Sequence, residues 1–168
     1  QAERAASSNL LCYVNADIIL LNDLLQAIDA VTTQRDQFLL VGRRWDIHIE
    51  GIMDSSAVDW ETGIRRLVAK EAILHPPSGI DYFVFRRGLW GEIPPFAVGR
   101  TAWDNWLVYR AQAQGAPVVD ATGAVTAVHQ NHDYSHASGA AKGAWKGPEA
   151  VRNQELMGGP AHRFDVDD

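Results

Sequence analysis

Apolar residues group into short blocks along the chain, and the spacing within each block predicts a strand or a helix. Residues 10–14, LLCYV, form a continuous apolar run that is typical of a strand buried on both faces. A polar turn, NAD at residues 15–17, comes next, and residues 21–31 then repeat apolar positions at helical intervals. The first unit is therefore expected to be a strand, a polar turn and a helix.

The same alternation continues through most of the chain. Further strands are expected over residues 37–49, 80–90, 117–122 and 124–130, and further helices over residues 54–74 and 100–116. Gly115 is placed to end the last of these helices. From residue 138 onward Gly, Ala, Lys and Pro dominate. The pattern thus predicts an α/β domain over residues 1–137 and an extended Gly/Ala-rich arm over residues 138–168, with one helical turn near residues 149–156.

Alternating strands and helices favour a layered α/β domain with a mainly parallel sheet flanked by helices. In such sheets, ligands sit beyond the carboxyl ends of the strands. Asp17 follows the first predicted strand, and His129 ends the last one. The stretch VHQNHDYSH, residues 128–136, also holds three of the six histidines of the chain. We therefore expect Asp17 and this histidine cluster to meet at one rim of the sheet.

Composition narrows the class of protein. The chain has 168 residues, of which 46% are hydrophobic and 21% charged, as in a globular domain with a sizeable core. A net charge of -6 without a Lys/Arg stripe argues against a nucleic-acid binder. The single Cys12 excludes an intrachain disulfide and a thiolate zinc cage. No apolar stretch is long enough to cross a membrane and no signal peptide is present, so a cytoplasmic setting is expected.

The candidate chemistry starts from Asp17, His129 and His132. One carboxylate with one or two imidazoles suits Mn²⁺ or Mg²⁺ bridging a diphosphate better than it suits a closed structural zinc. The sequence leaves two plainer interpretations open. In the first, Asp17 is a carboxylate at the entry to the following helix, where the helix dipole stabilises its negative charge. In the second, the histidine loop is a polar loop whose side chains satisfy their own hydrogen bonds.

Three motifs carry a family resemblance. YVNADIIL resembles the strand and DXD-type turn of nucleotide-sugar glycosyltransferases with the GT-A fold, with Asn15 in place of the first Asp. FAVGRTAWDNWLVYRAQAQG resembles the acceptor-side loop and helix of family 2-like members, whose general base matches Asp104. VTAVHQNHDYSH resembles the late strand and loop that supply a metal-binding His. The similarity covers most of the chain, from about Leu10 to Ser138.

This resemblance implies a partial GT-A-like fold and an inverting, metal-dependent sugar transfer. The donor would be a nucleotide-diphosphate sugar, and Asp104 would take the proton of the acceptor hydroxyl. From the sequence alone, Asp104 is equally well a carboxylate at a helix start, and the tryptophans are equally well packing residues. The expected substrate contacts are Asn15, Asp81, Trp90, Gly91 and Trp103.

The resemblance also predicts a truncation. In that family a nucleotide-binding half precedes the DXD-like turn, whereas nine residues precede Leu10 here. The chain is therefore expected to be the C-terminal portion of such an enzyme. Its first strand would then keep an unpaired edge, which favours a homodimer.

Two other functions remain open at this point. One is a non-catalytic relative that binds a glycan or a partner protein. The other is a metal-dependent phosphoester hydrolase that uses Asp17, His129, His132 and Asp133.

Overall fold

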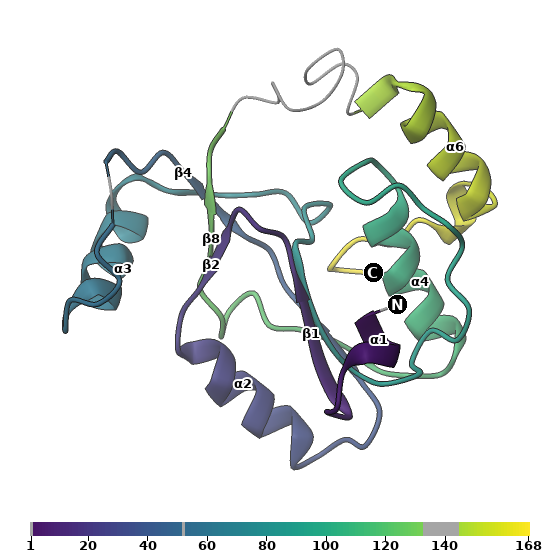
Figure 1. Cartoon of the computed structure of the whole chain (residues 1–168), viewed down its shortest axis with the longest axis horizontal. Helices are drawn as coiled ribbons and strands as arrows, with labels where there is room; N and C mark the ends of the chain where they lie inside the picture. The colour runs from purple at the N-terminus through teal and green to yellow at the C-terminus, as the bar shows by residue number, and fades with distance from the viewer. Residues whose placement is uncertain (1, 52, 133–144) are drawn as a thin grey trace.

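The computed structural model describes residues 2–51, 53–132 and 145–168 (Figure 1). The described strands form two four-stranded sheets, sheet A and sheet B. Sheet A has the order β1 (Leu10–Val14), β6 (Tyr82–Arg86), β3 (Leu39–Val41) and β7 (Val118–Asp120). Sheet B has the order β2 (Ile18–Leu20), β8 (Ala127–Gln130), β4 (Trp45–Ile47) and β5 (Ile73–Leu74).

The helices lie around these sheets. They are α1 (Ala2–Ala5), α2 (Asp23–Thr32), α3 (Trp60–Glu71), α4 (Trp103–Ala113), α6 (Pro148–Met157) and the 3₁₀ turn η1 (Pro160–His162). Figure 1 shows α3 at one end of the molecule and α4 with α6 at the other. Among the described residues, none of these helices has both the length and the apolar character needed to span a bilayer.

The expectation of a mainly parallel sheet flanked by helices is wrong, and both sheets are mixed. β6 runs antiparallel to β1 and to β3, and β8 runs antiparallel to β2, as β5 does to β4. Parallel pairing joins β3 to β7 and β4 to β8. The sequence pattern suggested strand–helix–strand crossovers, but β1 and β2, β3 and β4, and β7 and β8 follow one another and belong to different sheets. The protein is therefore a small mixed α/β domain.

Sheet A is covered on both faces, and successive side chains of β6 point alternately into the two cores on either side. Phe83 and Phe85 pack in the core that contains α4, whereas Tyr82 and Val84 pack in the core that contains Leu24 of α2. Successive residues of a strand point to opposite faces, so a fully apolar strand is what a sheet covered on both sides requires. The strand at residues 10–14 is confirmed at the predicted bounds, but the expectation that it is buried on both faces is wrong, because β1 is an edge strand with half-buried and exposed residues.

Sheet B has its own core against α3. Ile64 and Val68 of α3 pack with Ile47 of β4 and Val128 of β8. A polar network links α2, α3 and the residue before β8. Asp23 Oδ2 accepts hydrogen bonds from the backbone N–H and the hydroxyl of Thr126, at 3.0 and 2.7 Å, and pairs with Arg65 at 2.9 Å.

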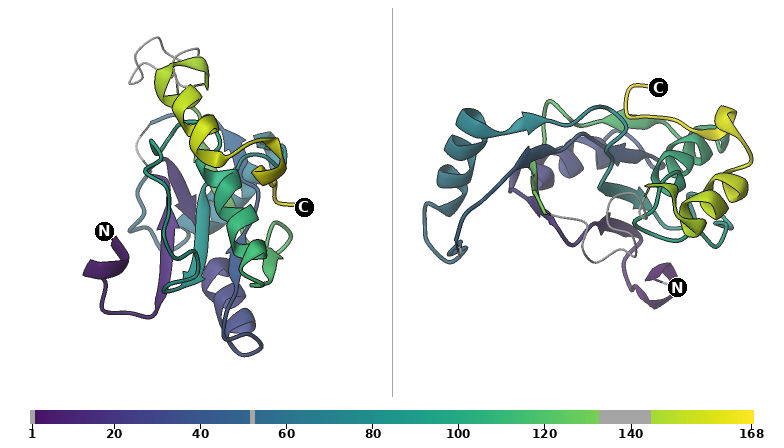
Figure 2. Two further views of the ribbon diagram at one scale, coloured as in Figure 1. Left: turned by 90° about the vertical axis from the view of Figure 1, so that its right-hand side faces the viewer. Right: turned by 90° about the horizontal axis from the view of Figure 1, so that it is seen from above.

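The C-terminal segment packs beside α4 (Figure 2). Helix α6 is longer than the single turn expected near residues 149–156, and Met157 and Val166 join the α4 core. The fully buried Asn153 fastens α6 to the loop before α4, because its amide bonds both the N–H and the C=O of Ala97. The beginning of the predicted arm, at residues 138–144, lies outside the described residues.

β1 forms one edge of sheet A, beside a largely apolar groove of about 430 Å³ that Leu11, Tyr13 and Ile93 help to line. An edge strand can pair with another chain, so self-association through β1 stays a prediction. We expect light scattering coupled to size exclusion to show a dimer at micromolar concentrations. Val14→Lys, at an exposed position of β1, is expected to give monomer. A wild-type monomer throughout this range would contradict the prediction.

Candidate metal centre and acid–base site

Sheet B aligns polar residues from three neighbouring strands. His129 of β8 is the pairing partner of Ile18 in β2 and of Asp46 in β4. Asp17 directly precedes Ile18, and its carbonyl accepts a hydrogen bond from the N–H of Gln130 at 3.1 Å. Residues directly opposite in paired strands point to the same face, so the register brings Asp46 and His129 together, while Asp17 reaches His129 from the turn before β2.

Asp17, His129 and His132 form a cluster that can hold a cation. The Nε2 atoms of His132 and His129 lie 3.0 and 3.4 Å from Asp17 Oδ2. One ligand atom from each residue lies within 4.8 Å of the others. Asp17 Oδ1 is buried and has no hydrogen-bond partner among the described residues, and a cation would satisfy it. The three residues predicted as metal ligands therefore meet, and they fit a divalent metal; metal binding itself stays a prediction.

The protonation state of Asp17 suits this role. The interaction with His129 lowers the pKa of Asp17, burial opposes that change, and His132 adds to it, so that the pKa lies well below the ordinary range. A carboxylate must be deprotonated to bind a metal. Asp17 is therefore ready to act as a ligand at neutral pH.

Asp104 lines the same cavity as the cluster. This cavity has a volume of about 190 Å³, and its walls include Asp17, His129, His132, Asp81 and Asp104. The carboxylate stands in the first turn of α4.

The backbone just before Asp104 is unusual. The buried Ala102 has a φ of 81°, in the left-handed region that non-glycine residues seldom adopt. Such a conformation persists where the surrounding structure holds it, and it is common at functional sites.

The environment of Asp104 suits proton transfer. Burial raises the pKa of Asp104 to about 7, the hydrogen bond from the N–H of Asn105 at 2.9 Å opposes this rise, and the nearby Asp81 adds to it. A general base works best when its pKa lies near the working pH. The residue that the sequence offered as a base thus has the properties of one, although its role in catalysis stays a prediction.

Asn15 and Asp81 also line the cavity, but their side chains bind each other. Asn15 Nδ2 donates to Asp81 Oδ1 at 2.5 Å, and Asn15 Oδ1 accepts from the Tyr13 hydroxyl at 3.0 Å. Arg44 holds the other oxygen of Asp81. An Asp at position 15 would place a second carboxylate against Asp81. The contact with Asp81 therefore requires a hydrogen-bond donor at position 15, which the amide of Asn15 supplies.

Asn15→Asp is expected to destabilise the fold by about 1–3 kcal/mol, because it removes a hydrogen-bond donor and adds a like charge beside Asp81. The loss should be larger at pH 8 than at pH 4, since protonation of one carboxyl restores a donor. Urea unfolding at both pH values measures it. Asn9→Asp, at an exposed position, serves as the control and should unfold like wild type. Equal stability of Asn15→Asp and wild type at both pH values would disprove this account.

The tryptophans predicted as substrate contacts are buried. Trp90 Nε1 donates to the carbonyl of Leu107 at 2.8 Å, and Trp90 lines the groove beside β1. Trp103 packs on Tyr13 with a ring-centroid distance of 5.2 Å and reaches the cavity wall. Gly91 has a φ of 64°, in a turn that follows Trp90.

Sequence reasoning overlooked several residues of the cavity wall. His75 was not among the predicted site residues, and its Nδ1 lies 2.5 Å from Asp46 Oδ2. Trp145, which is 48% exposed, also lines the cavity, as do Arg44 and Arg100. No local pattern marks these residues, because strand pairing and the return of the C-terminal segment bring them here. Asp133, which the hydrolase alternative would use, and His136, the last histidine of the stretch at residues 128–136, lie outside the described residues.

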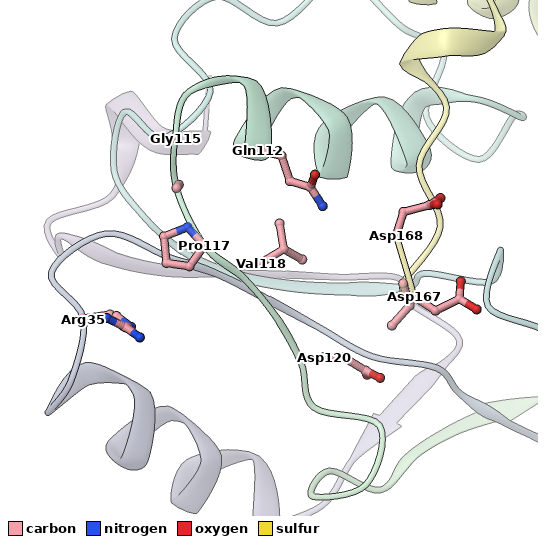
Figure 3. A pocket seen from close by; sticks show the side chains of 10 residues that line it. Arg35, Gln112, Gly115, Pro117, Val118, Asp120, Asp167 and Asp168 are labelled. Atoms are coloured by element: carbon pink, nitrogen blue, oxygen red, sulfur yellow. The ribbon is translucent and has the colours of Figure 1, made fainter.

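A second, larger cavity of about 710 Å³ lies beside β7 (Figure 3). Arg35, Asp120, Asp167 and Asp168 contribute charged side chains to it. Asp120 Oδ1 is already engaged by the backbone N–H and the hydroxyl of Thr122, at 2.8 and 2.5 Å. This cavity contains no histidine or cysteine among its lining residues, so it is the weaker candidate despite its size.

Comparison of the chain with protein-family models, with curated proteins and with solved structures finds no match. The class of protein must therefore be inferred from the residues of the site.

Proposed function

We propose that the protein is a metal-dependent glycosyltransferase, which moves a sugar from a nucleotide-diphosphate donor to an acceptor hydroxyl. The observation that carries the proposal is the sharing of one cavity by the Asp17, His129 and His132 cluster and by Asp104. Sugar transfer needs both parts, because negative charge grows on the departing diphosphate while the acceptor hydroxyl loses a proton.

The residues divide these two tasks. Asp17, His129 and His132 would hold Mn²⁺ or Mg²⁺, which when bound supplies positive charge for the diphosphate. Asp104 accepts the proton of the acceptor hydroxyl. Arg163 also lines the cavity, and its positive charge attracts an anionic donor, whereas Arg100 is paired with Glu149 at 2.8 Å. Arg44 is engaged by Asp46 and Asp81, so its part is structural.

The raised pKa of Asp104 favours a catalytic role over glycan binding alone. A module that only binds a glycan has no use for a carboxylate poised to exchange a proton near neutral pH. A phosphoester hydrolase would use the same metal ligands, and the activity test below separates it from sugar transfer.

The test is release of nucleoside diphosphate from a panel of uridine- and guanosine-diphosphate sugars with Mn²⁺, in the presence and absence of simple alkyl glycosides. We expect release that depends on both the acceptor and the metal and that stops when EDTA is added. Metal-dependent cleavage of p-nitrophenyl phosphate without any such release would support the hydrolase instead. Glycan binding without turnover of any donor would support the non-catalytic alternative.

A further inference from the structure

Asp46 stands behind the cation cluster, on the strand next to His129. Its β-strand neighbour across the β4–β8 pair is His129, and across the β4–β5 pair it is Ile73, two residues before His75. Across sheet B, in the strand order β2, β8, β4 and β5, the side chains therefore lie in the order Asp17, His129, Asp46 and His75. The order is fixed by register, since a slip of one residue would turn Asp46 to the opposite face.

Asp46 Oδ1 lies 3.0 Å from His129 Nδ1, the ring nitrogen opposite to the one that faces Asp17. The angle departs from ordinary hydrogen-bond geometry, and the buried Nδ1 has no hydrogen-bond partner among the described residues. His129 itself is only 6% exposed. The ring is therefore held between two carboxylates, with Nε2 toward Asp17 and Nδ1 toward Asp46.

Asp46 is held in turn by two further side chains. Arg44 Nε donates to Asp46 Oδ1 at 2.9 Å, and His75 Nδ1 lies 2.5 Å from Asp46 Oδ2. Arg44 also pairs with Asp81, which anchors the guanidinium from its other side. Gly79 leaves the room that this arrangement needs, because a Cβ atom at that position would lie 2.1 Å from the His75 ring.

We infer that Asp46 is a positioning residue of the metal centre, which orients the His129 ring so that Nε2 faces the cation. Metal-bound histidines commonly place their second ring nitrogen against a carboxylate, which fixes the ring and increases its basicity as a ligand. The inference rests on the metal-binding part of the proposed function and needs neither a donor nor an acceptor. Arg44 and His75 keep the Asp46 carboxylate in place.

The experiment titrates wild type and the variants Asp46→Ala and Asp46→Asn with Mn²⁺ alone, followed by electron paramagnetic resonance. Asp46→Ala is expected to weaken Mn²⁺ binding by about 10–100-fold. Asp46→Asn should weaken it less, because the amide keeps an oxygen near His129 Nδ1. Electron–nuclear double resonance with ¹⁵N-labelled histidine should show two coupled histidine nitrogens in wild type and a changed or lost coupling from His129 in Asp46→Ala.

Asp23→Ala is the matched control. It removes a carboxylate that also joins an arginine and a neighbouring segment, at Arg65 and Thr126, but that does not contact the cluster. We expect Asp23→Ala to lower stability and to leave Mn²⁺ binding and both couplings unchanged.

Three results would overturn the inference. They are no Mn²⁺ binding by wild type, unchanged binding and couplings in Asp46→Ala, and equal weakening in Asp23→Ala. If Asp46→Ala weakens Mn²⁺ binding but the wild-type protein transfers no sugar, the role of Asp46 is supported. That result would contradict only the proposed glycosyltransferase activity.

Discussion

Asp104→Asn is expected to lower kcat by about 10²–10⁴-fold and to leave Mn²⁺ binding unchanged. The amide has nearly the shape of the carboxylate but cannot take a proton from the acceptor hydroxyl. Steady-state kinetics with a donor and an acceptor identified in the screen measure the loss, and Mn²⁺ titration shows that the cluster is intact. Glu61→Gln changes a first-turn carboxylate of α3 and should retain wild-type turnover. Near-normal turnover in Asp104→Asn would show that Asp104 is not the base and is only a carboxylate at the start of α4.

The raised pKa of Asp104 predicts a pH dependence of the same reaction. Since the base must be deprotonated, kcat/KM of wild type should increase with pH and level off above about pH 7. Asp104→Asn should lack this step in its residual activity. An activity of wild type that stays constant between pH 5 and pH 8 would contradict the assignment of Asp104 as the base.

The same pKa has a consequence for stability. The ordinary pKa of Asp is 3.8, and burial raises that of Asp104 to about 7, so the folded protein holds a proton that the unfolded chain releases between these values. The contribution of this group to the free energy of unfolding is therefore favourable at low pH and decreases as the pH rises through that window. Asp104→Asn removes this dependence. We expect the variant to gain stability over wild type at pH 8 relative to pH 4 in urea unfolding.

Asp17→Ala is expected to weaken Mn²⁺ binding by more than about 100-fold. Loss of a residue that orients a ligand costs about 10–100-fold in metal affinity, and loss of a ligand should cost more. Asp17 is also the single carboxylate of the cluster, and both histidines lie against its Oδ2. Electron paramagnetic resonance of free and bound Mn²⁺ measures the change.

The histidines supply the companion variant for this prediction. His129→Ala combined with His132→Ala should weaken Mn²⁺ binding at least as much as Asp17→Ala does, because the double variant removes two of the three ligands. Asp29→Ala removes an exposed carboxylate of α2 and should bind Mn²⁺ like wild type. Unchanged binding in Asp17→Ala and in the double variant would show that the cluster is not a metal site.

Local pattern predicted several individual elements, but it missed β2 (Ile18–Leu20) and placed β5 (Ile73–Leu74) inside the helix expected over residues 54–74. The continuous apolar run at residues 10–14 predicted β1 at its bounds, and the helical spacing after it predicted α2. Residues 37–49 were expected to form one strand, yet β3 and β4 are separate strands in different sheets. The pattern of polar and apolar residues indicates which faces of a strand are buried. It does not indicate which other strand pairs with that strand.

Site residues divide in a similar way. Asp17, His129, His132 and Asp104 could be selected from the sequence because each combines a reactive side chain with a position at the end of a strand or the start of a helix. Their presence around one cavity was decided by the tertiary structure. The burial that raises the pKa of Asp104 likewise depends on how α4 packs, which no local pattern encodes.

The sequence by itself determined the apolar blocks, the polar residues that interrupt them, and hence the candidate ligands and base. Only the tertiary structure decided the mixed sheets and the network behind the cluster. Asp46 meets His129 because β4 pairs with β8, and it meets His75 because β4 pairs with β5. Strand pairing is a non-local contact set by the packing of the whole domain. Residues such as Asp46, which meet their partners only through strand pairing, cannot be identified from the local sequence pattern.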